Sequence, residues 1–243
     1  MSTAETSVYE WNDLNWRVIE QQVFKLQTRI YRAARRADVK AVHRLQRLLM
    51  RSWAARCLAI RRVTQDNRGK RTAGVDGIKN LSPARRLQLA SLLTLLPTAQ
   101  PARRVWIPKP GTTDKRPLAI PILFDRARQA LALLALEPEW EAVFEPHSYG
   151  FRPGRSTHDA IEAIFQAIYR KPKYVLDADI AKCFERIDQT ALLAKLHTFP
   201  RLRRAIKAWL KAGVLDGETL FPTQAGTPQG GVATPPTTVQ KRR

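Results

Sequence analysis

Two segments toward the end of this 243-residue sequence carry residue types that could transfer a nucleotidyl group. The first is an apolar run that ends at Asp177-Ala-Asp179, and the second is the glycine-rich stretch 226–231. Nucleotidyl transfer uses a pair of Mg²⁺ ions, which prefer carboxylate oxygens together with substrate phosphates and water. Because side chains alternate along a strand, a strand over Tyr174–Ile180 would present both carboxylates on one face. Phe184, at the following turn, could press on a sugar and exclude a 2′-hydroxyl.

A purely structural interpretation of the same residues stays open. Asp179 could cap the helix that follows it, and Phe184 could be an ordinary core residue. Taken alone, these residues favour that interpretation. Only further motifs in the same chain shift the balance toward chemistry.

The charge of the chain indicates what it binds. Lysines and arginines number 42 against 21 acidic residues, a net charge of +21. The excess is uneven, because residues 1–136 hold 26 basic and 9 acidic side chains. Some of this charge is solvated helix surface, but an excess of this size predicts a polyanionic partner that is bound through phosphates. We therefore expect nucleic-acid binding that weakens steeply as the salt concentration rises.

Composition also restricts the class of protein. Hydrophobic residues make up 44% of the chain, enough for a packed core. No run reaches the roughly 18 apolar residues of a membrane span, and no secretory signal is expected at the N-terminus. The two cysteines, Cys57 and Cys183, lack a metal-binding spacing. We expect a cytoplasmic protein of bacterial type in which Cys57 is a small core residue.

The N-terminal part predicts basic helices. Apolar residues recur at three- and four-residue steps over 13–36, with Asp13 as the expected N-cap, and again from Asp38 to about residue 62. The apolar stripes are core packing. The outer face of the second helix carries cations suited to phosphate contacts, among them Arg44, Arg47 and Arg51. A glycine-rich loop over 64–80 adds further cations, namely Arg68, Lys70 and Arg71.

The rest of the chain predicts short strands among helices. Ser82-Pro83 indicates a helix start that runs to about residue 96, and the runs 105–107 and 118–120 indicate a β-hairpin. A strand is expected over 174–180. The remaining helices are expected over 125–136, then after a break to residue 144, over 157–169 behind a Ser156 or Thr157 cap, and over 189–196 and 202–212.

The order of these motifs resembles the group II intron-encoded reverse transcriptase/maturase family. The resemblance runs from about residue 10 to 232. It rests on Arg68…Gly77, Arg103…Pro121, Ser148-Tyr-Gly-Phe-Arg-Pro-Gly-Arg-Ser156, Asp179-Ile-Ala-Lys-Cys-Phe184 and Gly226-Thr-Pro-Gln-Gly-Gly231. It implies an α+β fold, with the fingers and an incomplete palm of a right-hand polymerase behind a helical basic N-terminal region. It also implies an RNA-directed DNA polymerase that uses Mg²⁺.

The resemblance further implies roles for single residues. Asp179 would be the first catalytic metal ligand, with the Ile180 carbonyl beside it, and Phe184 would reject ribonucleotides. Asp177 departs from the small or neutral residue of the family, so its role is open. The remaining roles are a grip on the incoming triphosphate by Arg103, Lys109 and Arg116, packing near the nascent base pair by Gln229, and template contacts by Arg152 and Arg155.

These expectations divide the chain into three parts. Residues 1–100 would be the helical RNA-binding region, 101–231 the fingers and partial palm, and 232–243 an aberrant, disordered tail. In the family, the glycine loop is followed by a helix and a Tyr-x-Asp-Asp hairpin that supplies further carboxylates. The tail shows no such pattern, and Pro235-Pro236 excludes a helix there.

A truncated polymerase, inactive alone, is therefore the expected function. RNA would be its main partner, with DNA primer and dNTP as further ligands, no membrane, and self-association or a completing polypeptide to supply missing strands. The alternative is a maturase-like RNA-binding module that assists intron splicing without polymerase activity.

Overall fold

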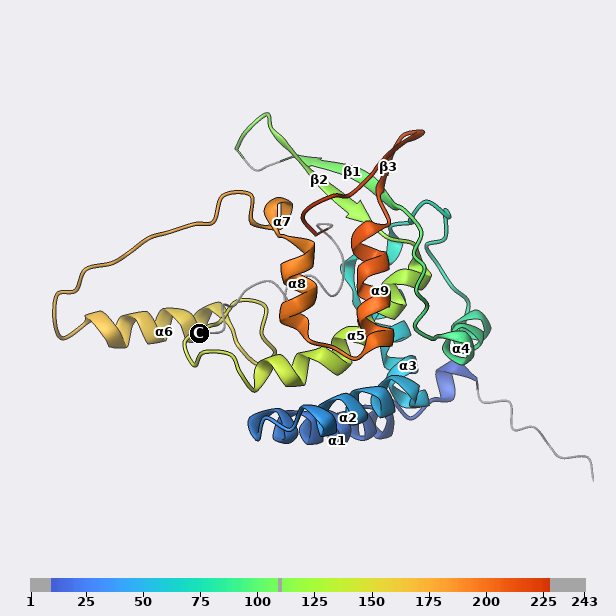
Figure 1. The fold of residues 1–243 in the computed structure, drawn as a ribbon, viewed down its shortest axis with the longest axis horizontal. Coiled ribbons are helices and arrows are strands. Elements are labelled where there is room, and N and C mark those ends of the chain that lie inside the picture. Colours follow the sequence, from blue (N-terminus) through green and yellow to red (C-terminus); the bar gives the residue numbers. More distant parts are fainter. Residues whose placement is uncertain (1–9, 109–110, 228–243) are drawn as a thin grey trace, which may run out of the picture.

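The computed structural model describes residues 10–108 and 111–227. Figure 1 shows a layer of N-terminal helices at one side of the molecule, a central helix against them, and a small sheet at the opposite side. This mixture of helices and strands confirms the α+β fold class. The helices of the N-terminal layer and the central helix are α1 (Trp16–Arg35), α2 (Val39–Arg51), α3 (Trp53–Arg61), α4 (Pro83–Leu92) and α5 (Leu123–Glu141).

The caps of the first helices follow short-range chemistry. Asp38 caps α2 as expected, because its carboxylate accepts a hydrogen bond from Ala41 N at 2.9 Å. Helix α1 is capped by Asn15, whereas Asp13 lies in the preceding 3₁₀ turn η1 (Trp11–Asp13), so the expected Asp13 cap is wrong. The long helix expected from Asp38 is likewise interrupted at Ser52, whose backbone is extended and whose hydroxyl caps α3.

Helix α5 is the centre of the core and runs unbroken through Pro138, against the break expected near residue 136. A proline inside a helix has no N–H for the carbonyl four residues before it. Here that carbonyl, of Leu134, accepts a hydrogen bond from Gln27 Nε2 of α1 at 2.9 Å. Because α1 supplies the missing donor and α5 is packed on three helices, the tertiary contacts outweigh the local helix breaker.

The sheet combines the expected hairpin with one that the sequence did not reveal. Strands β1 (Ala102–Pro108) and β2 (Lys115–Ile120) are antiparallel, as predicted. Strand β1 also pairs in parallel with β3 (Val214–Asp216), which forms a hairpin with β4 (Thr219–Phe221). Among the described residues the strand order is β2-β1-β3-β4, which places the chain just before the glycine loop beside the first hairpin.

The remaining elements lead into the glycine loop. Ser156 caps α6 in a capping box with Asp159, as the sequence indicates. Helix α4 ends at Leu92, a turn earlier than expected. Between α3 and α4 lie a π-helical turn η2 (Arg62–Asp66) and a 3₁₀ turn η3 (Arg68–Arg71), and after α5 come α6 (Thr157–Ile168), α7 (Cys183–Arg186), α8 (Gln189–Leu196) and α9 (Pro200–Lys211).

The strand expected over 174–180 is absent. The chain from α6 to α7 runs as an exposed, irregular segment away from the rest of the molecule (Figure 1), and Leu176 is 91% exposed. A strand becomes stable when neighbours pair its backbone and cover its apolar face. No described strand lies beside this segment. The expectation that strand alternation sets Asp177 and Asp179 on one face is therefore wrong for this structure.

Candidate functional site

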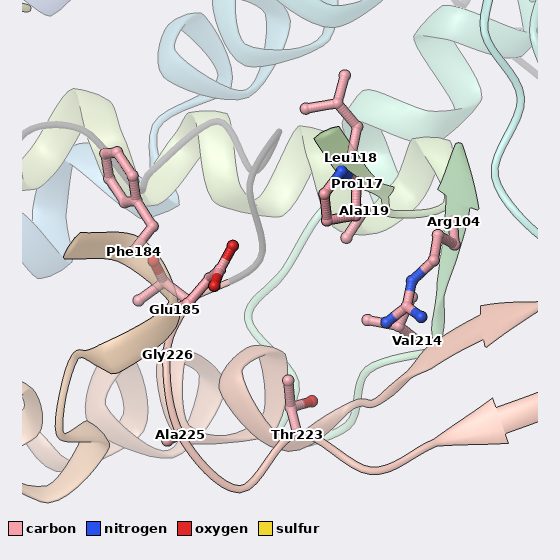
Figure 2. A pocket seen from close by; sticks show the side chains of 11 residues that line it. Arg104, Pro117, Leu118, Ala119, Phe184, Glu185, Val214, Thr223, Ala225 and Gly226 are labelled. Atoms are coloured by element: carbon pink, nitrogen blue, oxygen red, sulfur yellow. The ribbon is translucent and has the colours of Figure 1, made fainter. Parts of the chain in front are cut away.

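A pocket forms where the first hairpin, helix α7 and the start of the glycine loop meet. Figure 2 shows Arg104 and the β2 residues on one side and Phe184 and Glu185 on the other, with Gly226 and Ala225 below Glu185. The pocket joins three of the segments on which nucleotide chemistry was predicted. Its lining consists of Arg104, Pro117, Leu118, Ala119, Phe184, Glu185, Val214, Thr223, Ala225, Gly226 and Thr227.

The glycine loop is fixed directly on the turn that carries Phe184. Gly226 N donates to Ile187 O at 2.8 Å, and Thr227 N donates to Phe184 O at 2.7 Å. Gly226 has a φ of +77°, and a Cβ there would lie 2.6 Å from Phe184 O, so only glycine fits. Gln189 Nε2, from α8, donates to Gly226 O at 3.1 Å. These contacts fix Gly226 and Thr227 beside the turn that carries Phe184.

Arg104, for which the sequence predicted no role, lines this pocket, whereas Arg103 does not. The Arg103 Nε donates to Ala73 O at 3.0 Å, and its side chain holds the 68–77 loop. Arg104 lies 3.5 Å from a carboxylate oxygen of Asp216 and above the Phe221 ring. Neighbouring residues of a strand point to opposite faces, and the pairing with β3 and β4 decides which face is the pocket. The sequence shows two adjacent arginines, Arg103 and Arg104, but it does not tell which of them lies on the pocket face of the strand.

The other residues predicted to grip a triphosphate are placed in part. Arg116 is exposed and lies opposite Ile107, which puts it on the same face of the hairpin as Arg103. Lys109 and Gln229, and the tail 232–243, lie outside the described residues. Their predicted roles remain predictions.

Asp179 stands in the exposed segment before α7. Its Oδ1 accepts a hydrogen bond from Ile180 N at 2.8 Å, and Ile180 is 72% exposed. It does not cap α7, which begins after Lys182 without a side-chain cap. Phe184 is half-buried at the pocket, so part of its surface packs as the structural interpretation expected.

A divalent metal site is not assembled by the described residues. Within 10–108 and 111–227, no three His, Cys, Asp or Glu side chains form a group that could hold a metal ion. One exposed carboxylate from Asp179 does not meet the several oxygen ligands that Mg²⁺ takes from protein and substrate. The residues present therefore do not fit a two-metal centre, and we derive no reaction step through Mg²⁺.

Arg152 is engaged inside the protein. Its guanidinium forms a two-pronged pair with Glu141, at 3.0 and 2.5 Å, and donates to the carbonyls of Glu145 and Ser148. The side chain is 4% exposed. A guanidinium so used has little surface left to contact a template, so these contacts disfavour the template role expected of Arg152. Arg155 is exposed beside the Tyr149 ring, and its template contact stays a prediction.

The cations of the N-terminal region divide into free and engaged groups. Arg44, Arg47 and Arg51 are exposed along α2. Arg71 is exposed as well, while Lys70 Nζ donates to Gln65 O at 2.6 Å. Nothing is described of the Arg68 side chain. The α2 row is thus the clearest exposed cationic surface among the residues that the sequence singled out.

Hydrogen bonds from α5 hold the 68–77 loop in place. Arg126 of α5 donates to Gly69 O at 3.0 Å and to Thr72 O at 2.9 Å. Gly74 packs against the backbone of residues 121–122, since a Cβ there would lie 2.6 Å from Ile122 Cα. The loop is therefore a fixed part of the surface beside the β1–β2 hairpin.

Comparison with known proteins decides the family. Residues 11–93 match the N-terminal domain of reverse transcriptase, and residues 107–240 match reverse transcriptase (RNA-dependent DNA polymerase). The chain belongs to the reverse transcriptase family. No described helix of this reverse transcriptase chain is long and apolar enough to cross a membrane.

Individual relatives show which branch of the reverse transcriptase family the chain resembles. The chain is 35% identical over 208 residues to Protein YkfC of Escherichia coli, which is 80% of this chain and 54% of that protein. It is 33% identical over 177 residues to the group II intron-encoded protein LtrA of Lactococcus lactis, covering 70% of this chain and 29% of LtrA. Maturase-like protein 1 of Euglena gracilis is 29% identical over 82% of the chain. These relatives confirm the resemblance to group II intron-encoded reverse transcriptases and maturases, of which this chain spans about half the length or less.

Proposed function

We propose that this chain is the RNA-binding fingers portion of a group II intron-encoded reverse transcriptase/maturase. In this proposal its helical region 1–100 holds RNA, and the region 101–231 presents the pocket beside Phe184 to an incoming nucleotide. The exposed cationic row on α2 is the observation that supports RNA binding most directly. Arg44, Arg47 and Arg51 are exposed, and no described carboxylate forms an ion pair with them. Such cations release counterions when they bind phosphates.

Salt dependence tests the proposal. The purified 243-residue chain is titrated with a labelled single-stranded RNA by fluorescence anisotropy at a series of salt concentrations. The logarithm of the association constant should fall linearly with the logarithm of the salt concentration, by roughly 0.7 for each phosphate contact. A duplex DNA of equal length serves as the comparison. Absence of RNA binding at low salt, or a flat salt dependence, would contradict the proposal.

A maturase-like activity without polymerisation is the second candidate. It is favoured by the similarity to Maturase-like protein 1 and by the described residues, in which no three His, Cys, Asp or Glu side chains form a group that could hold a metal ion. RNA binding without primer extension is the outcome that this candidate requires. Primer extension by the same preparation would favour the polymerase.

A further inference from the structure

A second pocket, which shares no lining residue with the Phe184 pocket, is lined by arginines from three helices. Arg47 and Arg51 come from α2, Arg56 from α3 and Arg201 from α9. The floor is apolar, and a linker after α4 completes the wall. The remaining lining residues are Met50, Thr94, Leu95 and Phe199. The pocket thus takes residues both from the region that matches the N-terminal domain, 11–93, and from the region that matches the polymerase, 107–240.

Specific contacts hold these elements together at the pocket. Arg201 Nη2 donates to Thr94 Oγ1 at 2.7 Å and to Leu95 O at 3.1 Å, which ties α9 to the linker. The Arg47 guanidinium lies 5.5 Å from the centre of the Phe199 ring, a contact between α2 and the start of α9. Phe199 itself is 5% exposed. The elements that carry the four arginines are therefore packed against one another.

The positive charge of the pocket is not neutralised within the described chain. Its lining contains four arginines and no carboxylate, and none of the four forms an ion pair among the described residues. The Nε of Arg56 is buried without a hydrogen-bond partner. Gathering like charges around one cavity is unfavourable unless an anion enters it. Guanidinium groups are well suited to phosphate, because their N–H donors match its oxygens in pairs.

We propose that this four-arginine pocket binds a phosphodiester of single-stranded RNA, and so clamps one strand between the N-terminal helices and α9. The inference rests on the proposed RNA-binding function and assigns it a defined site. The cavity measures about 400 Å³, within the roughly 300–1,000 Å³ of pockets that hold a ligand. Exposed Arg44 lies about one helical turn before Arg47 on α2, so the cationic surface continues from the pocket along the helix. This continuity favours a polymer over a free phosphate.

Two double variants with equal loss of charge distinguish RNA binding in the pocket from a non-specific effect of the positive charge of the chain. Arg47→Gln/Arg51→Gln removes two charges inside the pocket, and Lys171→Gln/Lys173→Gln removes two exposed charges after α6, outside the pocket and outside the α2 row. RNA affinity and its salt slope are measured for both, with thermal melting to verify folding. The pocket pair should lose at least about tenfold in affinity and about 1.4 from the slope, two contacts of roughly 0.7 each. The control pair should lose about threefold or less. Equal losses in the two pairs would overturn the proposal.

The contribution of α9 is tested separately with single variants. Arg201→Gln should weaken RNA binding, while Arg204→Gln, an exposed arginine of the same helix outside the pocket, should not. Because Arg201 also ties α9 to the linker, Arg201→Lys keeps the charge and should restore part of the affinity. Equal affinity of Arg201→Gln and Arg204→Gln would remove α9 from the site and overturn the clamp.

Inorganic tripolyphosphate, added at constant ionic strength, distinguishes a free anion from an RNA strand. If the wild type binds tripolyphosphate through Arg47 and Arg51 while RNA affinity falls equally in both double variants, the pocket serves a free polyphosphate and the proposal is wrong. If the wild type binds no RNA at all, the proposed function itself fails. If the wild type binds RNA but the pocket variant loses no more affinity than the control variant, only the inference about the pocket fails.

Discussion

At the scale of single residues, the buried Arg152 side chain stabilises the loop that follows α5. Arg152 joins the end of α5 to residues 145–148 through four hydrogen bonds. Removing one partner of a buried pair leaves the other charge uncompensated, which costs about 3–5 kcal/mol. Glu141 is 29% exposed, so water recovers part of this cost.

Arg152→Ala should lower the free energy of unfolding by about 3 kcal/mol, at the low end of that range because Glu141 stays partly solvated. Arg152→Lys should recover little, since a lysine cannot form the two-pronged contact. Chemical denaturation measures both variants. Arg155→Ala, an exposed neighbour, is the control and should change stability little. If Arg152→Ala unfolds like the wild type, the clamp is not a stabilising contact.

A second residue-scale prediction concerns Glu137 of α5. Burial raises the pKa of this carboxyl, with Arg62 lowering it in part and Glu141 adding repulsion. The folded state therefore disfavours the carboxylate, a penalty present in full above the raised pKa and absent below the ordinary value of 4.5. Glu137→Gln should raise the melting temperature at neutral pH, and the gain should vanish as the pH falls below 4.5. A gain that does not depend on pH would contradict this origin.

At the scale of elements, α2 presents one face to the core and the other to solvent. Val42, Leu45 and Leu49 are buried, while the arginines of the opposite face are exposed. Replacing exposed residues leaves the core side untouched. Charge on this face can therefore be changed without loss of the fold.

Replacing Arg44, Arg47 and Arg51 by Ala should flatten the plot of log affinity against log salt by about 2 units, because each lost phosphate contact removes roughly 0.7. Replacing Arg170, Lys171 and Lys173, three exposed cations after α6, is the control with equal charge loss and should change the slope less. An unchanged slope in the α2 variant, with melting as in the wild type, would place the RNA surface elsewhere.

At the scale of the whole molecule, the β1–β2 hairpin, the Phe184 turn and the first residues of the glycine loop line one pocket, but the described residues form no carboxylate group that could hold a metal ion. The sequence contains no acidic residue after Glu218. Two metal ions held in register need more oxygen ligands than the exposed Asp179 provides. In the described residues, the pocket proposed to face a nucleotide therefore forms without a metal-binding group.

A polypeptide of these 243 residues should not extend a DNA primer on an RNA template, with either Mg²⁺ or Mn²⁺. Gel analysis of a labelled primer measures this, with an active full-length group II intron reverse transcriptase as the positive control. The decisive comparison is Asp179→Asn. Extension by the wild-type chain that disappears in Asp179→Asn would show that the chain completes a metal site by another route.

The sequence by itself determined the family, the charge and the features set by near neighbours. The motif order gave the reverse transcriptase kinship, and the Asp38 and Ser156 caps and the β1–β2 hairpin depend on residues a few positions apart. Caps and hairpins can be predicted from the sequence because the residues that form them are close together along the chain.

Only the tertiary structure decided the features whose partners lie far along the chain. Gln27 satisfies Leu134 O from 107 residues away and lets α5 continue through Pro138. The pairing of β1 with β3, across more than a hundred residues, turns Arg104 rather than Arg103 toward the Phe184 pocket. Residues 174–180 have strand-like composition but no described strand beside them. In each case the local preference was real, and the presence or absence of a distant hydrogen-bonding partner decided the outcome.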